Sequence, residues 1–216
     1  IKKYSDKAKA GCVEAQNDIG HLYSEDENIL ALDLSPSEAN EKALHWFTEA
    51  ADKGNGSTKA MFNLGQLYLR EATNPKETGE NKKKALQTAI DWYDCAAKKD
   101  MPNAQNTLAD IYCEFGSILG LSEKTINDKA FVLYEAAERN DHARATFSLG
   151  KLHQTKGNLE EAGRLITKAL NLNCDEDQMR LGLVYMNAVN GITIPGLTKE
   201  QREEKALECL SNAAAQ

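Results

Sequence analysis

One short apolar pattern returns along the whole chain and constrains what the chain can fold into. It is clearest at residues 60–68, where Ala60, Leu64, Leu67 and Tyr68 have the spacing that places side chains on one face of an α-helix. We call these positions the first stripe. Its other copies are Ala15, Ile19, Leu22 and Tyr23; Ala104, Leu108, Ile111 and Tyr112; Ala145, Leu149, Leu152 and His153; and, with Asp177 in the alanine position, Leu181, Val184 and Tyr185.

A small residue follows the second apolar position of each first stripe. These residues are Gly20, Gly65, Ala109, Gly150 and Gly182. Glycine inside a helix costs roughly 1 kcal/mol relative to alanine. We therefore expect another helix to cross close to each of these positions.

A second helical pattern, the second stripe, alternates with the first and pairs bulky residues with small ones, as interdigitating helices require. Its copies are Ala43, Trp46, Phe47, Ala50 and Ala51; Ala89, Trp92, Tyr93, Ala96 and Ala97; Ala130, Leu133, Tyr134 and Ala137; Ala162, Leu165, Ile166 and Ala169; and Ala206, Cys209, Leu210 and Ala213. From the first position of a second stripe to the first position of the following first stripe there are 15 to 17 residues. From a first stripe to the second stripe that follows it, the distance varies from 17 to 29 residues. Helices that alternate in this way, with insertions at one edge, are typical of a solenoid of helical hairpins.

The combined pattern resembles a known repeat. Ala-x-x-x-Leu-Gly-x-x-Tyr, followed by Lys-Ala-x-x-Trp-Phe-x-x-Ala-Ala-x-x-Gly, is similar to the Sel-one-like repeat (SLR), a relative of the tetratricopeptide repeat, and residues 42–54 match its second half almost letter for letter. Residues 145–173 resemble instead a plain tetratricopeptide unit. The resemblance implies an all-α, right-handed superhelical solenoid of antiparallel helix–turn–helix repeats. It specifies a fold more narrowly than a function.

The repeats predict the organisation of the chain. We expect a single solenoid domain over residues 1–216, with repeats at about 12–56, 57–100, 101–140, 141–173 and 174–216. Residues 1–11 fit the tail of a preceding second-stripe helix, and the last residues lie inside another such helix. We therefore interpret the chain as a fragment of a longer repeat protein.

Short polar signals predict where helices begin. Ser35 with Glu38, and Thr198 with Gln201, have the spacing of capping boxes. Asp100, with Pro102 two residues later, is expected to start the first-stripe helix of the third repeat. The segments expected as loops or turns are the acidic residues 25–34, residues 54–56 and residues 72–81.

Charge and cysteine usage narrow the function classes. The net charge of −7 argues against binding to a phosphate backbone, and no apolar run approaches the ~20 residues that span a bilayer. Cys12, Cys95, Cys113, Cys174 and Cys209 are odd in number, are irregularly spaced and have no zinc-site spacing. We expect reduced thiols in a cytoplasm or host cytosol, with Cys209 as a small core residue, and no metal or cofactor. The missing N-terminus leaves a secreted or periplasmic setting open.

The sequence offers little for catalysis. No serine, cysteine or carboxylate lies in a recognised nucleophile motif, and no glycine-rich phosphate loop is present. His142 and His153 lie near one helix face, but His153 occupies the tyrosine position of the first stripe, which favours a packing role. We predict a protein that is not an enzyme. The alternatives are a hydrolase of the cysteine-rich SLR type, similar to a β-lactamase, or the recruiting segment of a larger enzyme.

The resemblance implies where a partner would bind, because the first-stripe helices of tetratricopeptide-like solenoids line the concave face. The candidate residues beside the first stripe are Asn17, His21, Asn63, Gln66, Arg70, Asn106, Asp110, Lys151 and Arg180. Asparagine amides can satisfy both the N–H and the C=O of an extended peptide. We therefore predict an amide ladder of Asn17, Asn63 and Asn106 in a scaffold or adaptor that binds a partner peptide or helix. The rival surface is the acidic segment at residues 25–33.

Overall fold

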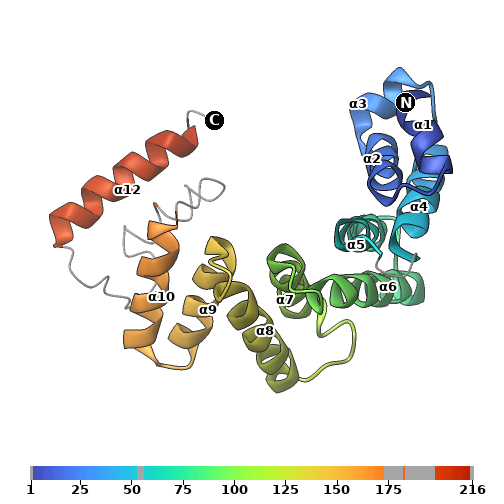
Figure 1. Ribbon diagram of the computed structural model, residues 1–216. Coiled ribbons are helices and arrows are strands. Elements are labelled where there is room, and N and C mark those ends of the chain that lie inside the picture. The colour runs from blue at the N-terminus through green and yellow to red at the C-terminus, as the bar shows by residue number, and fades with distance from the viewer. Residues whose placement is uncertain (1, 53–55, 173–181, 183–197, 215–216) are drawn as a thin grey trace. The chain divides into compact units, whose positions relative to one another are not determined.

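The computed structural model describes residues 2–52, 56–172, 182 and 198–214, and every regular element within them is an α-helix (Figure 1). The chain divides into two compact units, residues 1–121 and 122–216. The first unit contains α1 (Lys2–Lys9), α2 (Val13–Ser24), α3 (Asp26–Ala31), α4 (Pro36–Asp52), α5 (Thr58–Thr73), α6 (Gly79–Ala97) and α7 (Pro102–Phe115). The second contains α8 (Glu123–Glu138), α9 (Ala143–Thr155), α10 (Leu159–Asn171) and α12 (Lys199–Ala214).

Helices that carry the first stripe alternate with helices that carry the second. In the first unit α2 packs against α4 and α5 packs against α6, and in the second unit α9 packs against α10. These hairpins are joined by packing of α4 on α5 and of α6 on α7 in the first unit, and of α8 on α9 in the second. The predicted all-α solenoid of helical hairpins is confirmed. The single domain and the repeat limits stay predictions.

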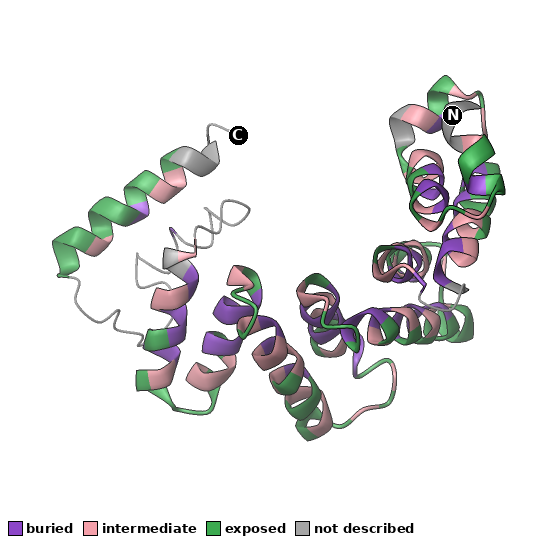
Figure 2. Ribbon diagram, viewed as in Figure 1, coloured by how far each residue is buried: buried purple, intermediate pink, exposed green. Residues whose placement is uncertain are grey.

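Alanines of both stripes form the centre of the helix contacts. Ala43, Ala60, Ala89, Ala104 and Ala145 are fully buried, and Figure 2 shows buried residues on the surfaces that neighbouring helices share within each unit. A methyl group lets two helix backbones approach closely while bulky neighbours fill the space beside it. The stripes are therefore packing patterns.

Each glycine predicted at a close crossing meets a bulky residue of the second stripe. A Cβ added to Gly20 would lie 2.5 Å from a ring carbon of Phe47, and one added to Gly65 would lie 2.9 Å from the Tyr93 ring. A Cβ added to Gly150 would lie 2.9 Å from a side-chain carbon of Ile166, and one added to Gly182 would lie 2.6 Å from a side-chain carbon of Leu210. Such distances are well inside van der Waals contact. The expected close crossings are confirmed at these four glycines.

The predicted capping boxes are present. The side-chain hydroxyl of Ser35 accepts a bond from the Glu38 backbone N–H at 3.3 Å, and the Glu38 carboxylate accepts bonds from the Ser35 backbone N–H at 3.0 Å and hydroxyl at 2.7 Å. Thr198 and Gln201 make the same reciprocal pair at the start of α12, at 3.3 Å and 2.9 Å. These side chains satisfy backbone donors that the first helical turn leaves without partners.

Asp100 does not cap α7 as predicted; it terminates α6. Its φ of 55° is left-handed, its N–H bonds to Ala97 O at 3.0 Å, and Met101 is the residue at the N-cap. Asp141 has the same role after α8, with a φ of 53°. In the SLR pattern a glycine stands at this place, and Gly11 after α1 has the expected φ of 89°. A left-handed residue lets the chain leave a helix while its last carbonyls are bonded, and aspartate tolerates that conformation better than most residues.

Two segments predicted as loops are partly helical. Residues 26–31 of the acidic segment form α3, which buries Ile29, so tertiary packing stabilises a turn that local sequence does not favour. The predicted loop at 72–81 is shorter, because α5 continues to Thr73 and α6 begins at Gly79. In the predicted turn at 54–56, residues 54 and 55 lie outside the described part of the chain.

Candidate functional site

A groove of about 320 Å³ lies on the first unit and contains several predicted binding residues. Its lining comes from α2, α4, α5 and the residue after α2, and consists of His21, Ser24, Glu25, Phe47, Asn63, Gln66, Leu67 and Arg70. We call it the α2–α5 groove. Four of the predicted residues, His21, Asn63, Gln66 and Arg70, therefore come together on one surface.

Two of the predicted asparagines bond directly to each other. The Asn63 side-chain N–H donates to Asn17 Oδ1 at 3.1 Å, which joins α5 to α2. Both side chains are half-buried. Among the described residues, nothing else bonds to the Asn17 amide nitrogen or to the Asn63 carbonyl oxygen. The pair therefore presents one donor group and one acceptor, the combination that a peptide group complements.

Arg70 is fixed in place on the wall of the groove. Its guanidinium donates to the backbone oxygen of Ser24 at 3.4 Å and to the side-chain oxygen of Asn40. The Ser24 oxygen belongs to the last turn of α2, where carbonyls lack helical partners and the helix dipole favours a cation. Arg70 thus links α5 to both helices of the preceding hairpin.

His21 and Glu25 form the exposed edge of the groove. His21 Nδ1 lies 3.0 Å from Glu25 Oε1, one helical turn away, and about half of each side chain is exposed. Such a pair contributes little stability at the surface. Its position beside Asn63 and Gln66 gives the groove a polar edge that can accept or donate hydrogen bonds.

Asn106 does not join the predicted ladder. It donates to Asp110 Oδ2 at 3.1 Å within α7, and only 5% of its surface is exposed. The three asparagines do not share one register: Asn63 stands three residues after the first alanine of its stripe, whereas Asn17 and Asn106 stand two after theirs. One residue turns a side chain about 100° around the helix axis. The ladder is therefore a pair, Asn17 with Asn63.

The remaining predicted residues lie apart from this groove. Lys151 is an exposed residue of α9 in the second unit, and Arg180 lies outside the described residues. Sequence reasoning missed Ser24, Phe47 and Leu67, which line the groove. Leu67 was assigned to packing alone, yet it is only half-buried. The available signal was its helical spacing of four residues from Asn63.

The histidines of the second unit have structural roles. His142 Nδ1 accepts a bond from the Ala145 backbone N–H at 3.2 Å and so caps α9. The His153 ring packs on Phe131 with centroids 5.3 Å apart, which agrees with its place in the first stripe. Among the described residues no three His, Cys, Asp or Glu side chains gather as metal ligands would. These histidines stabilise helices.

The described cysteines form no disulfide with one another and are spread over both units. Cys12, Cys95 and Cys113 are exposed. Cys209 is partly exposed, so the prediction of a small core residue is wrong; Leu207, two residues before it in α12, is 70% exposed. Partial burial raises the pKa of the Cys209 thiol. Cys174 lies outside the described residues.

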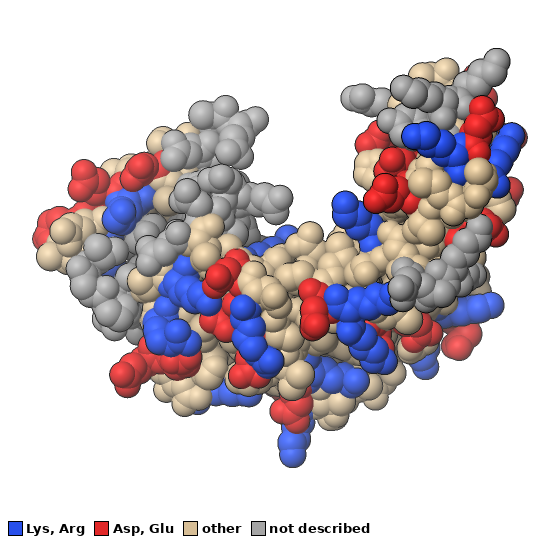
Figure 3. Space-filling view, in the orientation of Figure 1, with Lys and Arg blue, Asp and Glu red and all other residues tan. Residues whose placement is uncertain are grey.

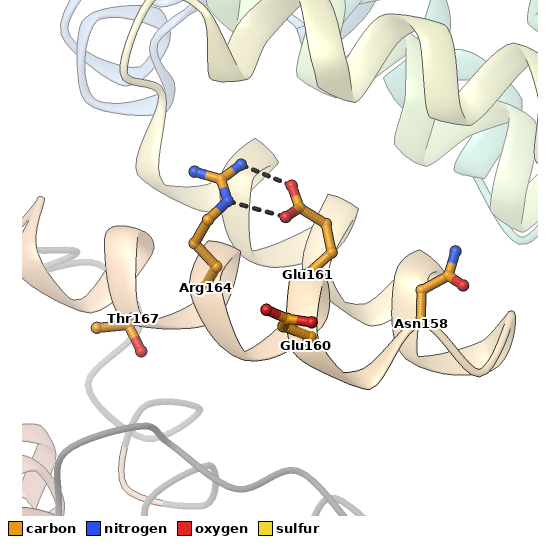
Figure 4. A pocket seen from close by; sticks show the side chains of 5 residues that line it. All are labelled: Asn158, Glu160, Glu161, Arg164 and Thr167. Atoms are coloured by element: carbon orange, nitrogen blue, oxygen red, sulfur yellow. Dashed lines mark hydrogen bonds and ion pairs between the residues drawn. The ribbon is translucent and has the colours of Figure 1, made fainter.

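A larger hollow of about 650 Å³ lies along α10 (Figure 4). Its described lining is Asn158, Glu160, Glu161, Arg164 and Thr167, all from this helix or the residue before it. The figure shows Glu161 and Arg164 pointing toward each other, and they form a two-bond ion pair at 2.6 Å and 2.9 Å. Because this pair is satisfied and one helix supplies the whole described wall, the hollow is a weaker candidate than the α2–α5 groove.

Comparison with known proteins defines the fold. No family model and no curated protein matches the chain. Among solved structures, a Sel1 repeat protein from Oxalobacter formigenes superposes with a TM-score of 0.68 at 22% identity, over 100% of this chain and 78% of that one. A MamA RS-1 double mutant superposes with a TM-score of 0.52 at 17% identity, over 94% of this chain and 97% of that one. The chain therefore has the fold of Sel1-like and tetratricopeptide-like repeat proteins, as its repeated motif predicts.

Proposed function

We propose that this chain is a non-catalytic scaffold that binds an extended peptide segment of a protein partner in the α2–α5 groove. The observation that carries the proposal is the Asn17–Asn63 pair. Its two amides bond to each other at 3.1 Å and leave one donor group and one acceptor without another partner among the described residues; Asn63 lines the groove, and Asn17 is joined to it by this bond. A peptide group offers the complementary acceptor and donor, so an extended segment can bond without displacing the pair.

The surroundings of the pair favour a segment that is held in one position. Arg70 is anchored to Ser24 and Asn40, and Phe47 on the wall is buried to 1% exposure. Side chains that are already held in place before a partner binds lose less conformational entropy on binding. Gln66 is exposed beside the pair and supplies a further donor and acceptor.

Charge supports a protein partner over a nucleic acid. The net charge is −7, and Lys and Arg are interspersed with Asp and Glu on the face shown in Figure 3. Binding to a phosphate backbone draws on clustered cations. No helix of the described residues has the length and apolar character needed to cross a bilayer. Cys12, Cys95 and Cys113 are exposed and form no disulfide with one another, which fits a reducing compartment such as a cytoplasm or host cytosol.

The test is partner capture with a groove variant and a matched control. The groove variant is Asn63→Ala with Gln66→Ala, and the control is Asn81→Ala with Gln87→Ala, which makes the same chemical change on the exposed side of α6. Overlapping synthetic peptides of a captured protein are then titrated by fluorescence anisotropy. We expect the groove variant to weaken the tightest peptide by about 10-fold, because two hydrogen-bonding side chains are lost.

The control variant should bind that peptide with unchanged affinity. Circular dichroism must show the same helix content in all three proteins. Equal affinity of the groove variant and the wild-type protein for the peptide would contradict the proposal and move the binding surface away from α2 and α5.

A further inference from the structure

A second groove, with an apolar floor and a negative rim, lies where α3 and the start of α4 face the end of α5. Its volume is about 590 Å³, within the range of side-chain and small-ligand sites. The lining consists of Ile29, Pro36, Ser37, Asn40, Glu41, Leu44, Leu67, Tyr68, Arg70, Glu71 and Asn74. We call it the α3–α5 groove.

The floor of this groove is apolar. Ile29 is 7% exposed, and Leu44, Leu67 and Tyr68 are half-buried, so each of the three keeps part of its apolar surface accessible. Leu30, which follows Ile29 on α3, is 82% exposed. Covering half-buried aliphatic and aromatic surface is favourable roughly in proportion to the area removed from water. An occupant of this groove therefore presents apolar side chains to its floor.

The rim of the groove is negative. Glu41 on α4 and Glu71 on α5 are exposed, and among the described residues neither carboxylate has an ion-pair partner. The single cation of the lining, Arg70, is directed to neutral oxygens of Ser24 and Asn40. The last turn of α5 adds the negative end of its helix dipole. At the start of α4 the positive end is offset by Glu38, which is bonded to Ser35.

We infer that the α3–α5 groove binds a short basic segment of a protein partner, in which leucine-like side chains are flanked by lysine or arginine. The apolar side chains cover Leu44, Leu67 and Tyr68, while the flanking cations meet Glu41 and Glu71. Opposite charges across such a rim set the orientation and raise the association rate more than they add affinity. An acidic or uncharged segment satisfies the floor but leaves both carboxylates without partners.

The two grooves share Leu67 and Arg70 but can be tested separately. Of the two grooves, Glu41, Leu44 and Glu71 line the α3–α5 groove and not the α2–α5 groove, whereas Asn63 and Gln66 line the α2–α5 groove and not the α3–α5 groove. Substitutions at Glu41 and Glu71 therefore report on the second site without touching the amide pair.

The probe is a blocked hexapeptide with two central leucines and two lysines on each side. Its binding is followed by NMR of methyl-labelled protein at low ionic strength. We expect the largest shift changes at the methyl groups of Ile29, Leu44 and Leu67. The double variant Glu41→Lys with Glu71→Lys should weaken binding about tenfold, because two attractions become repulsions.

Matched controls separate this site from general attraction to an acidic protein. Glu114→Lys with Glu204→Lys makes the same change in net charge at exposed positions of α7 and α12, and should leave the affinity within about twofold. Asn63→Ala should also leave it unchanged. Peptides with glycine in place of leucine, or glutamate in place of lysine, should bind at least about tenfold more weakly.

Three results with the variant peptides and proteins would overturn the inference. They are equal binding of the glycine peptide, equal binding of the glutamate peptide, and an equal loss of affinity in both charge-reversal variants. Shift changes confined to residues outside the α3–α5 groove, or a complete lack of binding by the leucine–lysine peptide, would overturn it as well.

Discussion

Gly65 lies so close to Tyr93 that a Cβ at Gly65 would be 2.9 Å from three carbons of the ring. Gly20 and Phe47 make the same contact in the preceding hairpin, where the distance is 2.5 Å. Because Tyr93 and Phe47 are each only 1% exposed, both rings are held by the side chains packed around them. The small residues of the first stripe thus set the distance between the two helices of a hairpin.

Substitution of these glycines by alanine should destabilise the protein, although alanine favours a helix by roughly 1 kcal/mol. We expect Gly65→Ala to lower the free energy of unfolding by about 1–3 kcal/mol through overpacking, and Gly20→Ala to lower it more. Urea denaturation measures both. In a Tyr93→Leu background the penalty of Gly65→Ala should shrink, since the clashing ring is gone. A gain in stability from Gly65→Ala alone would refute the close crossing.

The left-handed aspartates should respond to glycine in the opposite way. Asp100 and Asp141 have φ values of 55° and 53°. Glycine removes the penalty of about 1–2 kcal/mol that a left-handed conformation imposes on other residues. It also makes the unfolded chain more flexible, which costs about 0.5–1 kcal/mol of stability. Asp100→Gly should therefore stabilise the protein by up to about 1 kcal/mol. Asp141→Gly should gain less, because it also loses the contact of Asp141 with Lys168 at 2.8 Å. Thermal unfolding followed by circular dichroism checks both, with Gly157→Asp expected to destabilise.

The capping box of α4 should make stability depend on pH. Bonds from the Ser35 hydroxyl, and then from its backbone N–H, lower the pKa of Glu38 below its ordinary 4.5. A lowered pKa means that the stabilisation is fully present above the ordinary value and is lost as pH falls through the folded-state value. Glu38→Gln should therefore flatten the stability profile between about pH 6 and pH 3.

The capping box of α12 supplies the control for that prediction. It pairs Thr198 with Gln201, and neither side chain titrates. Gln201→Ala should cost the same stability at both ends of the pH range in urea titrations. A Glu38→Gln profile parallel to that of the wild-type protein would show that the α4 capping box carries no proton linkage.

Lys168 should stabilise the second unit by joining α10 to the end of α8. Its ammonium lies 2.9 Å from Glu138 Oε1 and 2.8 Å from Asp141 Oδ1. The bond to Asp141, followed by the bond to Glu138, raises the pKa of Lys168. The contribution is therefore present below the ordinary lysine pKa of 10.5 and is lost as pH rises through the folded-state value.

Removal of this cation should be measurable but modest. We expect Lys168→Met to lower the unfolding free energy by about 0.5–1 kcal/mol at neutral pH, and by less in high salt, because the pair is partly solvated. Arg139→Met, which breaks the more exposed 3.4 Å pair with Glu135, should change it by less than about 0.5 kcal/mol. Equal effects of the two substitutions in urea denaturation would contradict the linking role of Lys168.

The sequence by itself determined the hairpins, the glycine crossings and the capping boxes. The sequence signal for each lies within one or two helical turns, where spacing alone fixes which side chains share a face or reach a backbone donor. Ala60, Leu64 and Gly65 predict a buried stripe with a close crossing, and Ser35 with Glu38 predicts the start of α4. Both predictions are confirmed, because the capping box is a contact within one turn and a small residue beside a buried stripe marks a close crossing whichever side chain of the facing helix it meets.

Only the tertiary structure decided which polar side chains meet. Asn63 bonds to Asn17, 46 residues away, and Arg70 reaches Ser24 and Asn40, 46 and 30 residues away. A shift of one residue turns a side chain by about 100°, and the offset between packed helices is set by the interdigitation of all their side chains together. The stripes define the contacting faces, whereas the alignment of α3, α4 and α5 creates the two grooves.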